Sequence, residues 1–126
     1  GVDIQQVWFA GCHSDIGGGL APDKDGSRLS DFPLSWIAQE AIGCGLELAE
    51  HLDADIILNA TSKLNESYEG KWHLAGQHKR TVTSYFKIHQ SVKLRYEKDS
   101  DYRPEKLVAR LGTPPKWEEL VPLNPR

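Results

Sequence analysis

Residues 6–19 read Gln6-Val7-Trp8-Phe9-Ala10-Gly11-Cys12-His13-Ser14-Asp15-Ile16-Gly17-Gly18-Gly19. Val7, Trp8 and Phe9 are β-branched or aromatic with no polar residue among them, which favours a strand that is covered on both faces. Gly11 ends this run. The three glycines at 17–19 allow positive φ angles that other residues resist, so they predict a sharp turn. The stretch therefore predicts a core strand that delivers a histidine onto a glycine-rich loop.

The composition indicates a small, mildly acidic domain. A chain of 126 residues suffices for one domain with one modest core. Its formal net charge of −3 gives no electrostatic attraction to nucleic acid or to an anionic membrane, so we expect no nucleic-acid partner. The apolar runs are short, so we expect no integral membrane segment and no signal peptide. Cys12 and Cys44 lack a C-x-x-C spacing, and we expect both to be reduced thiols.

The chain contains no methionine, not even at position 1. It also begins only a few residues before a strand of the buried type, which is typical of a cut through a larger domain. We therefore expect residues 1–126 to be the C-terminal portion of a longer polypeptide.

A helix is expected soon after the glycine turn. Ser30 or Asp31 supplies an N-cap oxygen, and Pro33 fits the first turn, where its missing donor costs nothing. Gly43 and Gly45 end the helix. One apolar face at helical spacing consists of Leu34, Ile37, Ala38 and Ala41.

The rest of the chain is less regular. Residues 53–58 fit either a short strand or a buried helical turn, whereas 80–88 have strand composition. Residues 89–96 fit one or two helical turns. The tail at 97–126 contains several prolines, so we expect it to lie extended along the surface.

His13 is the candidate catalytic residue. An imidazole directly after a core strand is well placed as a general base, because its ordinary pKa lies near physiological pH. The alternative is a loop histidine that caps a backbone group. No G-x-S-x-G segment occurs, so a serine nucleophile of that type is missing. Cys12 is adjacent, but neighbouring side chains on an extended strand point to opposite faces, which argues against a Cys-His pair.

A metal site would use Cys12, His13 and Asp15 with a fourth ligand from His51, His73, His78 or His89. Three ligands crowded into four residues make poor tetrahedral geometry, so we expect no metal and no cofactor.

The second half of the chain is locally basic. The basic residues are His78, Lys79, Arg80, Lys87, Lys93 and Arg95. We interpret them as a solvated face, although contact with a phosphate-bearing substrate stays open. The role of His89 also stays open.

The opening residues resemble a known family. The stretches that carry the resemblance are Val7-Trp8-Phe9-Ala10-Gly11-Cys12-His13-Ser14-Asp15-Ile16-Gly17-Gly18-Gly19 and Leu29-Ser30-Asp31-Phe32-Pro33-Leu34-Ser35-Trp36-Ile37. They resemble the uncharacterised α/β-hydrolase family that includes the phospholipase effectors of type VI secretion. The likeness is specific over about residues 5–46. Shorter stretches at 67–72, 89–92 and 102–104 resemble the family's C-terminal region in order and approximate spacing.

This resemblance implies an α/β fold with a Ser-Asp-His triad on a doubly wound sheet. Residues 1–126 would be the C-terminal portion of one catalytic domain, with its last strand, its histidine loop, a packing helix and an extended proline-rich tail at 97–126. His13 takes the place of the triad histidine, and Asp15 with Gly17, Gly18 and Gly19 supports its loop. Asp15 follows His13 too closely to be the triad acid. Leu20 stands where the family often carries an aromatic residue.

The implied function is that of an incomplete serine hydrolase, esterase-like or phospholipase-like. Its partners would be a lipid or acyl-ester substrate and the rest of its own polypeptide, which carries the serine and the aspartate. The chain alone would be inactive, because a base without a nucleophile leaves little rate. The alternative is a stand-alone, non-catalytic binding domain on the same scaffold. Localisation stays open between the cytoplasm and delivery by a secretion system.

Overall fold

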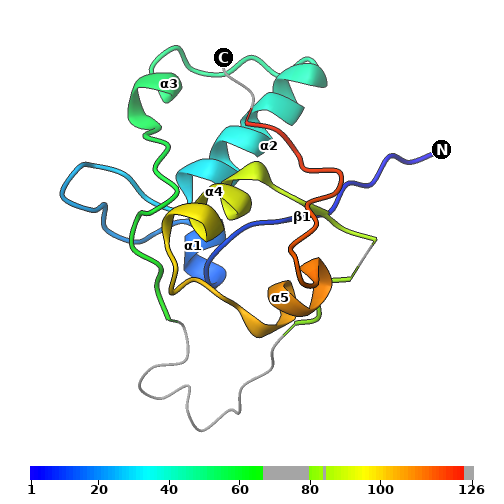
Figure 1. Ribbon diagram of the computed structural model, residues 1–126. Coiled ribbons are helices and arrows are strands. Elements are labelled where there is room, and N and C mark those ends of the chain that lie inside the picture. The colour runs from blue at the N-terminus through cyan, green and yellow to red at the C-terminus, as the bar shows by residue number, and fades with distance from the viewer. Residues whose placement is uncertain (67–79, 84, 124–126) are drawn as a thin grey trace, which may run out of the picture.

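The centre of the molecule is a two-stranded parallel sheet (Figure 1). The computed structural model describes residues 1–66, 80–83 and 85–123. Strand β1 (Val7–Trp8) pairs with β2 (Lys87–Ile88), with Val7 opposite Lys87. The predicted strand at 7–9 is therefore confirmed over two residues, which are half-buried rather than fully covered. Of the predicted strand at 80–88, only β2 is regular within the described residues.

Strand β2 has neighbours on both sides. The C-terminal segment forms a single parallel bridge to it, between His89 and Val121. The N–H of Val121 donates to the carbonyl of Ile88 at 2.9 Å, and the N–H of Gln90 donates to the carbonyl of Val121 at 2.8 Å. The end of the described chain is thus held against the sheet, whereas β1 lies at its edge.

Helices surround this sheet (Figure 1). They are α1 (His13–Gly17), α2 (Asp31–Gly43), α3 (Leu52–Asp55), α4 (Gln90–Lys98) and α5 (Glu105–Leu111). The ambiguous stretch at 53–58 is helical only in its first part, and the helical turns expected at 89–96 are confirmed as α4. Within the described residues, no helix combines the length and the apolar character needed to cross a bilayer.

Helix α2 begins and ends where the sequence predicts, but the predicted apolar face is buried only in part. Leu34 and Ile37 are exposed, whereas Phe32 and Ala38 are buried. The ring of Phe32 lies 6.0 Å from that of His89, and the ring of Trp36 lies 5.9 Å from that of Phe9. Aromatic contacts one helical turn apart therefore help to select the face that packs inward. Of the predicted apolar face, Ala38 is buried as expected, whereas the expectation for Leu34 and Ile37 is wrong.

The main core cluster lies between β2 and helices α4 and α5. It consists of Ile88, Val92, Leu107 and Leu111. The expectation that the whole tail at 97–126 is extended is wrong, because α5 forms within it and contributes Leu107 and Leu111 to this core. Pro104 precedes α5 and Pro114 follows it, so these prolines flank the helix without interrupting its hydrogen bonds.

The glycine turn follows the short helix α1. Gly18 and Gly19 have φ angles of +83° and +94°, as the sequence predicts. Gly17 departs from the prediction because it is the last residue of α1. The resembling stretch at 67–72 and the residues His73 and His78 lie outside the described residues.

We expect Gly18→Val to destabilise the chain by about 1–3 kcal/mol, because a β-branched residue is strained at positive φ. Chemical denaturation followed by circular dichroism measures this change. Gly17→Val is the matched control, since Gly17 is helical and has open space at its Cβ position. Equal losses in the two variants would show that the backbone angle at Gly18 is unimportant.

Candidate active site

His13 opens helix α1 just beyond the turn that leaves β1. The predicted histidine loop is therefore a tight turn followed by a short helix, and the loop assignment for His13 is wrong. The helix starts here because the carboxylate of Asp15 accepts a hydrogen bond from the N–H of Cys12 at 3.0 Å, which closes the first turn. The side chain of His13 is exposed to solvent.

Asp15 ties this turn to a distant segment. It is only 2 % exposed, and its carboxylate accepts from the Asn65 N–H at 3.0 Å and from Asn65 Nδ2 at 2.7 Å. With the bond from Cys12, a buried carboxylate is satisfied by three donors, as a buried charge requires. Asp15 therefore stabilises the backbone around His13, because its carboxylate oxygens accept hydrogen bonds from Cys12 and Asn65.

Gly11 is required by the same arrangement. Its φ angle is +113°, and a Cβ placed there would lie 2.4 Å from Cβ of Asp15. Real Cβ atoms do not approach so closely, so the turn before His13 accommodates only glycine at this position.

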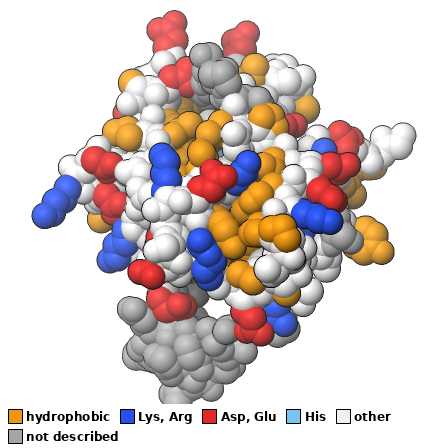
Figure 2. Space-filling view, in the orientation of Figure 1, with side chains coloured by type: hydrophobic (Ala, Val, Ile, Leu, Met, Phe, Trp, Pro, Cys, Tyr) orange, Lys and Arg blue, Asp and Glu red, His pale blue; other side chains and the backbone are white. Residues whose placement is uncertain are grey.

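His13 borders a large hollow of ≈ 960 Å³, comparable in size to small-molecule sites. Its apolar lining is Val7, Trp8, Phe9, Ile16, Leu64, Val82, Ile88, Val92 and Leu107. Its charged lining is Glu66, Arg80, Asp101, Arg103, Glu105 and Lys106. Figure 2 shows one face of the molecule, where apolar side chains gather near the centre with acidic and basic side chains around them. An exposed imidazole beside a hollow with apolar and charged lining is accessible to a reacting group.

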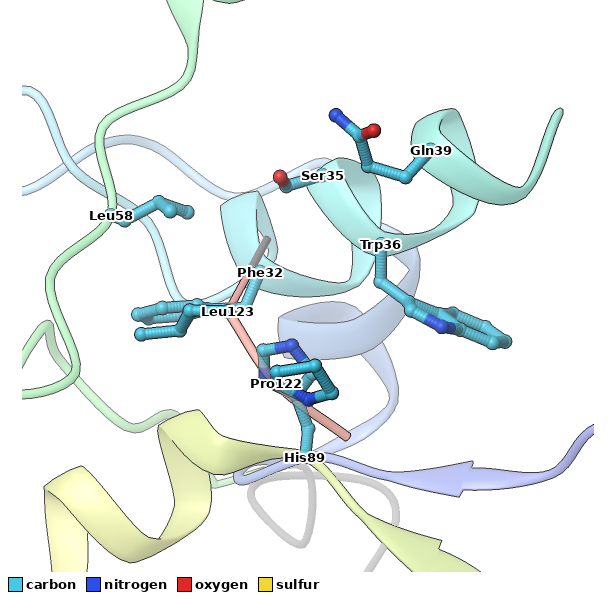
Figure 3. Close-up of a pocket in the computed structure, with 8 residues that line it drawn as sticks. All are labelled: Phe32, Ser35, Trp36, Gln39, Leu58, His89, Pro122 and Leu123. Atoms are coloured by element: carbon cyan, nitrogen blue, oxygen red, sulfur yellow. The ribbon is translucent and has the colours of Figure 1, made fainter. Parts of the chain in front are cut away.

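His89 lies elsewhere, in a buried position. It is 3 % exposed, and its ring stacks on Phe9 with a centroid distance of 4.6 Å. Its Nδ1 accepts the N–H of Ser91 at 3.2 Å and lies 2.8 Å from Ser91 Oγ, so it caps helix α4. It also lines a small cavity of ≈ 10 Å³, together with Phe32, Ser35, Trp36, Gln39, Leu58, Pro122 and Leu123 (Figure 3).

Burial lowers the pKa of His89 to about 4. Its imidazole is therefore neutral at pH 7, and so low a pKa makes it a poor general base. In the sequence, the only sign that His89 is a buried helix cap is its position directly after a strand. His13 also follows a strand closely, so this sign does not distinguish the two histidines.

We expect His89 to make stability pH-dependent. Because its pKa in the folded chain is about 4 and its ordinary value is 6.5, the unfolded chain binds the extra proton between these values. The contribution of neutral His89 to the free energy of unfolding is complete above pH 6.5. It falls by on the order of 2–3 kcal/mol as the pH drops toward 4. Denaturation midpoints from pH 7 to 4 measure it, with His89→Gln as the non-titrating control. A parallel loss in both proteins would assign the effect to other groups.

Of the metal ligands considered from the sequence, His73 and His78 lie outside the described residues, and the others form no metal-binding cluster there. Within the described ranges, no group of three or more His, Cys, Asp or Glu side chains lies close enough to hold an ion. Cys12 and Cys44 are free thiols.

The basic stretch is not a uniformly solvated face. Arg95 is 6 % exposed, and its guanidinium donates to the carbonyls of Ala60 at 3.0 Å and Ser62 at 2.6 Å. The expectation of a solvated Arg95 is wrong, because a guanidinium has enough donors to satisfy buried loop carbonyls. Lys93 does lie at the surface, where it pairs with Glu97.

Comparison with known proteins places a family match on this same region. Residues 1–40 match the family model described as T6SS, phospholipase effector Tle1-like, catalytic domain. This match supports a phospholipase-like hydrolase for the stretch that contains β1, His13 and the glycine turn. It does not extend to the resembling stretches at 89–92 and 102–104.

A curated relative matches about half of the chain. The uncharacterized protein YEL023C of Saccharomyces cerevisiae is 41% identical over 61 residues, which are 48% of this chain and 9% of that protein. The chain thus spans less than a tenth of the length of the relative it matches. No solved structure matches the chain.

Proposed function

We propose that this chain is the C-terminal portion of an α/β-hydrolase domain and supplies the histidine of a phospholipase-like serine hydrolase. The observation that carries the proposal is the position of His13, which is exposed on the large hollow within the stretch matched by the catalytic-domain model. The buried carboxylate of Asp15 and the glycine at 11 hold the turn before it. The serine comes from the rest of the polypeptide, because the chain has no G-x-S-x-G segment. The chain order Ser, Asp, His that the family resemblance implies puts the triad acid there as well.

In this role His13 acts first as a base and then as an acid. Its imidazole accepts the proton of the serine hydroxyl while the serine oxygen attacks the ester carbonyl. The alcohol leaves with that proton, and an acyl-enzyme remains. Water then loses a proton to the imidazole and attacks the acyl group. As the bond to the serine oxygen breaks, the imidazole gives that proton to this oxygen, and the fatty acid leaves. The apolar lining of the hollow suits an acyl chain, because it removes apolar surface from water.

The first test compares two proteins. We expect the isolated 126-residue chain to hydrolyse neither p-nitrophenyl butyrate nor phosphatidylcholine vesicles, since a base without a nucleophile leaves only a minor rate. A polypeptide that contains residues 1–126 together with the serine-bearing part should hydrolyse at least one of them.

Turnover by the isolated chain that disappears in His13→Ala would contradict the requirement for a separate serine. An inactive longer polypeptide would instead favour the non-catalytic binding domain. Circular dichroism of each protein confirms that it is folded before its rate is interpreted.

A further inference from the structure

Asn65 reaches the turn that carries His13 through a single carboxylate. Its Nδ2 donates to Asp15 Oδ1 at 2.7 Å, and its N–H donates to Asp15 Oδ2 at 3.0 Å. The same Oδ2 accepts the N–H of Cys12 at 3.0 Å, and the N–H of Asp15 donates to the carbonyl of Cys12 at 3.0 Å. His13 lies inside this closed turn. The backbone that carries the imidazole is therefore tied to Asn65 by the oxygens of Asp15.

The segment before Asn65 is anchored in the body of the molecule. It follows α3 and runs past α1 (Figure 1). The buried Arg95 of α4 donates to the carbonyls of Ala60 and Ser62 in this segment. Helix α4 comes soon after β2, which is the partner strand of β1. Asn65 is thus held through the same sheet that leads into the turn.

We propose that Asn65 is a positioning residue for His13 and that it acts through the carboxylate of Asp15. This inference rests on the proposed function. Asp15 is 2 % exposed, so without the Nδ2 donor one of its oxygens loses a partner at a place shielded from water. The carboxylate then regains a partner only by moving, and this movement displaces the first turn of α1. A misplacement of about 1 Å at a catalytic group is enough to cost on the order of 100-fold in rate.

The competing role for Asn65 is direct contact with the substrate, because Asn65 also lines the hollow beside His13. A side chain that binds the substrate contributes to KM, whereas a positioning residue contributes to the chemical step and thus to kcat. Both the N–H and Nδ2 of Asn65 donate to Asp15, which favours the positioning role.

Steady-state kinetics of Asn65→Leu test this role in the polypeptide that contains residues 1–126 and the serine. Leucine keeps the approximate size of the side chain and the backbone N–H, but it removes the Nδ2 donor. We expect kcat to fall by roughly 10- to 100-fold, while KM stays within about twofold of the parent value. An unchanged kcat with a raised KM would place Asn65 on the substrate and overturn the proposal.

Asn59→Leu is the matched control. Asn59 lies in the same segment, and its Nδ2 also donates to a carboxylate, but to that of Asp25 at 2.8 Å. Its kcat should stay within about twofold of the parent value, because the bonds to Asp15 are intact. A similar fall of kcat in both variants would assign the effect to the segment as a whole, and the proposal would be wrong.

Hydrogen exchange of the Cys12 amide is a second measurement that needs no activity. In the same polypeptide, Asn65→Leu should accelerate this exchange by roughly 10-fold, because the Cys12 N–H is held by Asp15, whereas Asn59→Leu should leave it unchanged. The amides of Lys87 and His89, which are bonded in the sheet, should exchange at the parent rate and so report that each variant is folded.

Unchanged exchange of the Cys12 amide in Asn65→Leu would overturn the proposal, whether or not the polypeptide is an active hydrolase. A parent polypeptide that hydrolyses no ester would contradict the proposed function instead, and accelerated exchange at Cys12 would still support the hold of Asn65 on the turn.

Discussion

We expect His13→Ala to lower kcat/KM for phospholipid hydrolysis by about four orders of magnitude in a polypeptide that carries both residues 1–126 and the serine. The reason is that no other described histidine borders the hollow, so nothing replaces the imidazole that accepts the serine proton. Folding should be unaffected, because the His13 side chain is exposed. Steady-state kinetics with a thermal melt of each variant measure both effects.

His51→Ala is the matched control, because His51 is also exposed and does not line the hollow. Its kcat/KM should stay within about twofold of the parent value, as expected for a surface change away from the site. If His13→Ala retains turnover and His51→Ala loses it, the base assignment is wrong.

Gly11→Ala is expected to cause the largest loss of stability, roughly 3 kcal/mol or more, because strain at positive φ adds to an overpacked contact. The added Cβ would meet the buried side chain of Asp15, whose carboxylate is held by donors on both sides. Urea denaturation of the isolated chain measures the change in the free energy of unfolding.

The control for Gly11→Ala is Gly43→Ala. Gly43 is the last residue of α2 and has nothing within 4 Å of its Cβ position, so alanine there should be neutral or slightly stabilising. Similar free energies for the two variants would show that the turn before His13 adapts to a side chain.

The segment around His13 shows what a single sequence can predict about local structure. The run Val7 to Phe9 predicts a strand, and the glycines after it predict positive φ; both hold, with Gly18 and Gly19 at positive φ. These features are local, since they depend on side-chain branching and on the absence of a Cβ. The family match of residues 1–40 falls on the same stretch.

The sequence favours His13 over His89 as the base, but it could not predict how differently the two histidines are buried. Both His13 and His89 come shortly after apolar residues, yet one is exposed on the hollow and the other is buried against Phe9. Burial depends on which segments pack around a residue, and it lowers the pKa of His89 to about 4. The pattern of residue types along the chain does not specify which segments pack around a given residue.

The sequence by itself determined the elements whose causes are local: the strand at β1, the glycine turn, and the start and end of α2 through Pro33 and Gly43. Only the tertiary structure decided which side chains those elements bury. Contacts between segments far apart in the chain turned the inner face of α2 toward Phe9 and buried Arg95 under two loop carbonyls. The physical reason is that propensity acts over a few residues, whereas burial is settled by surfaces that meet only after the chain has folded.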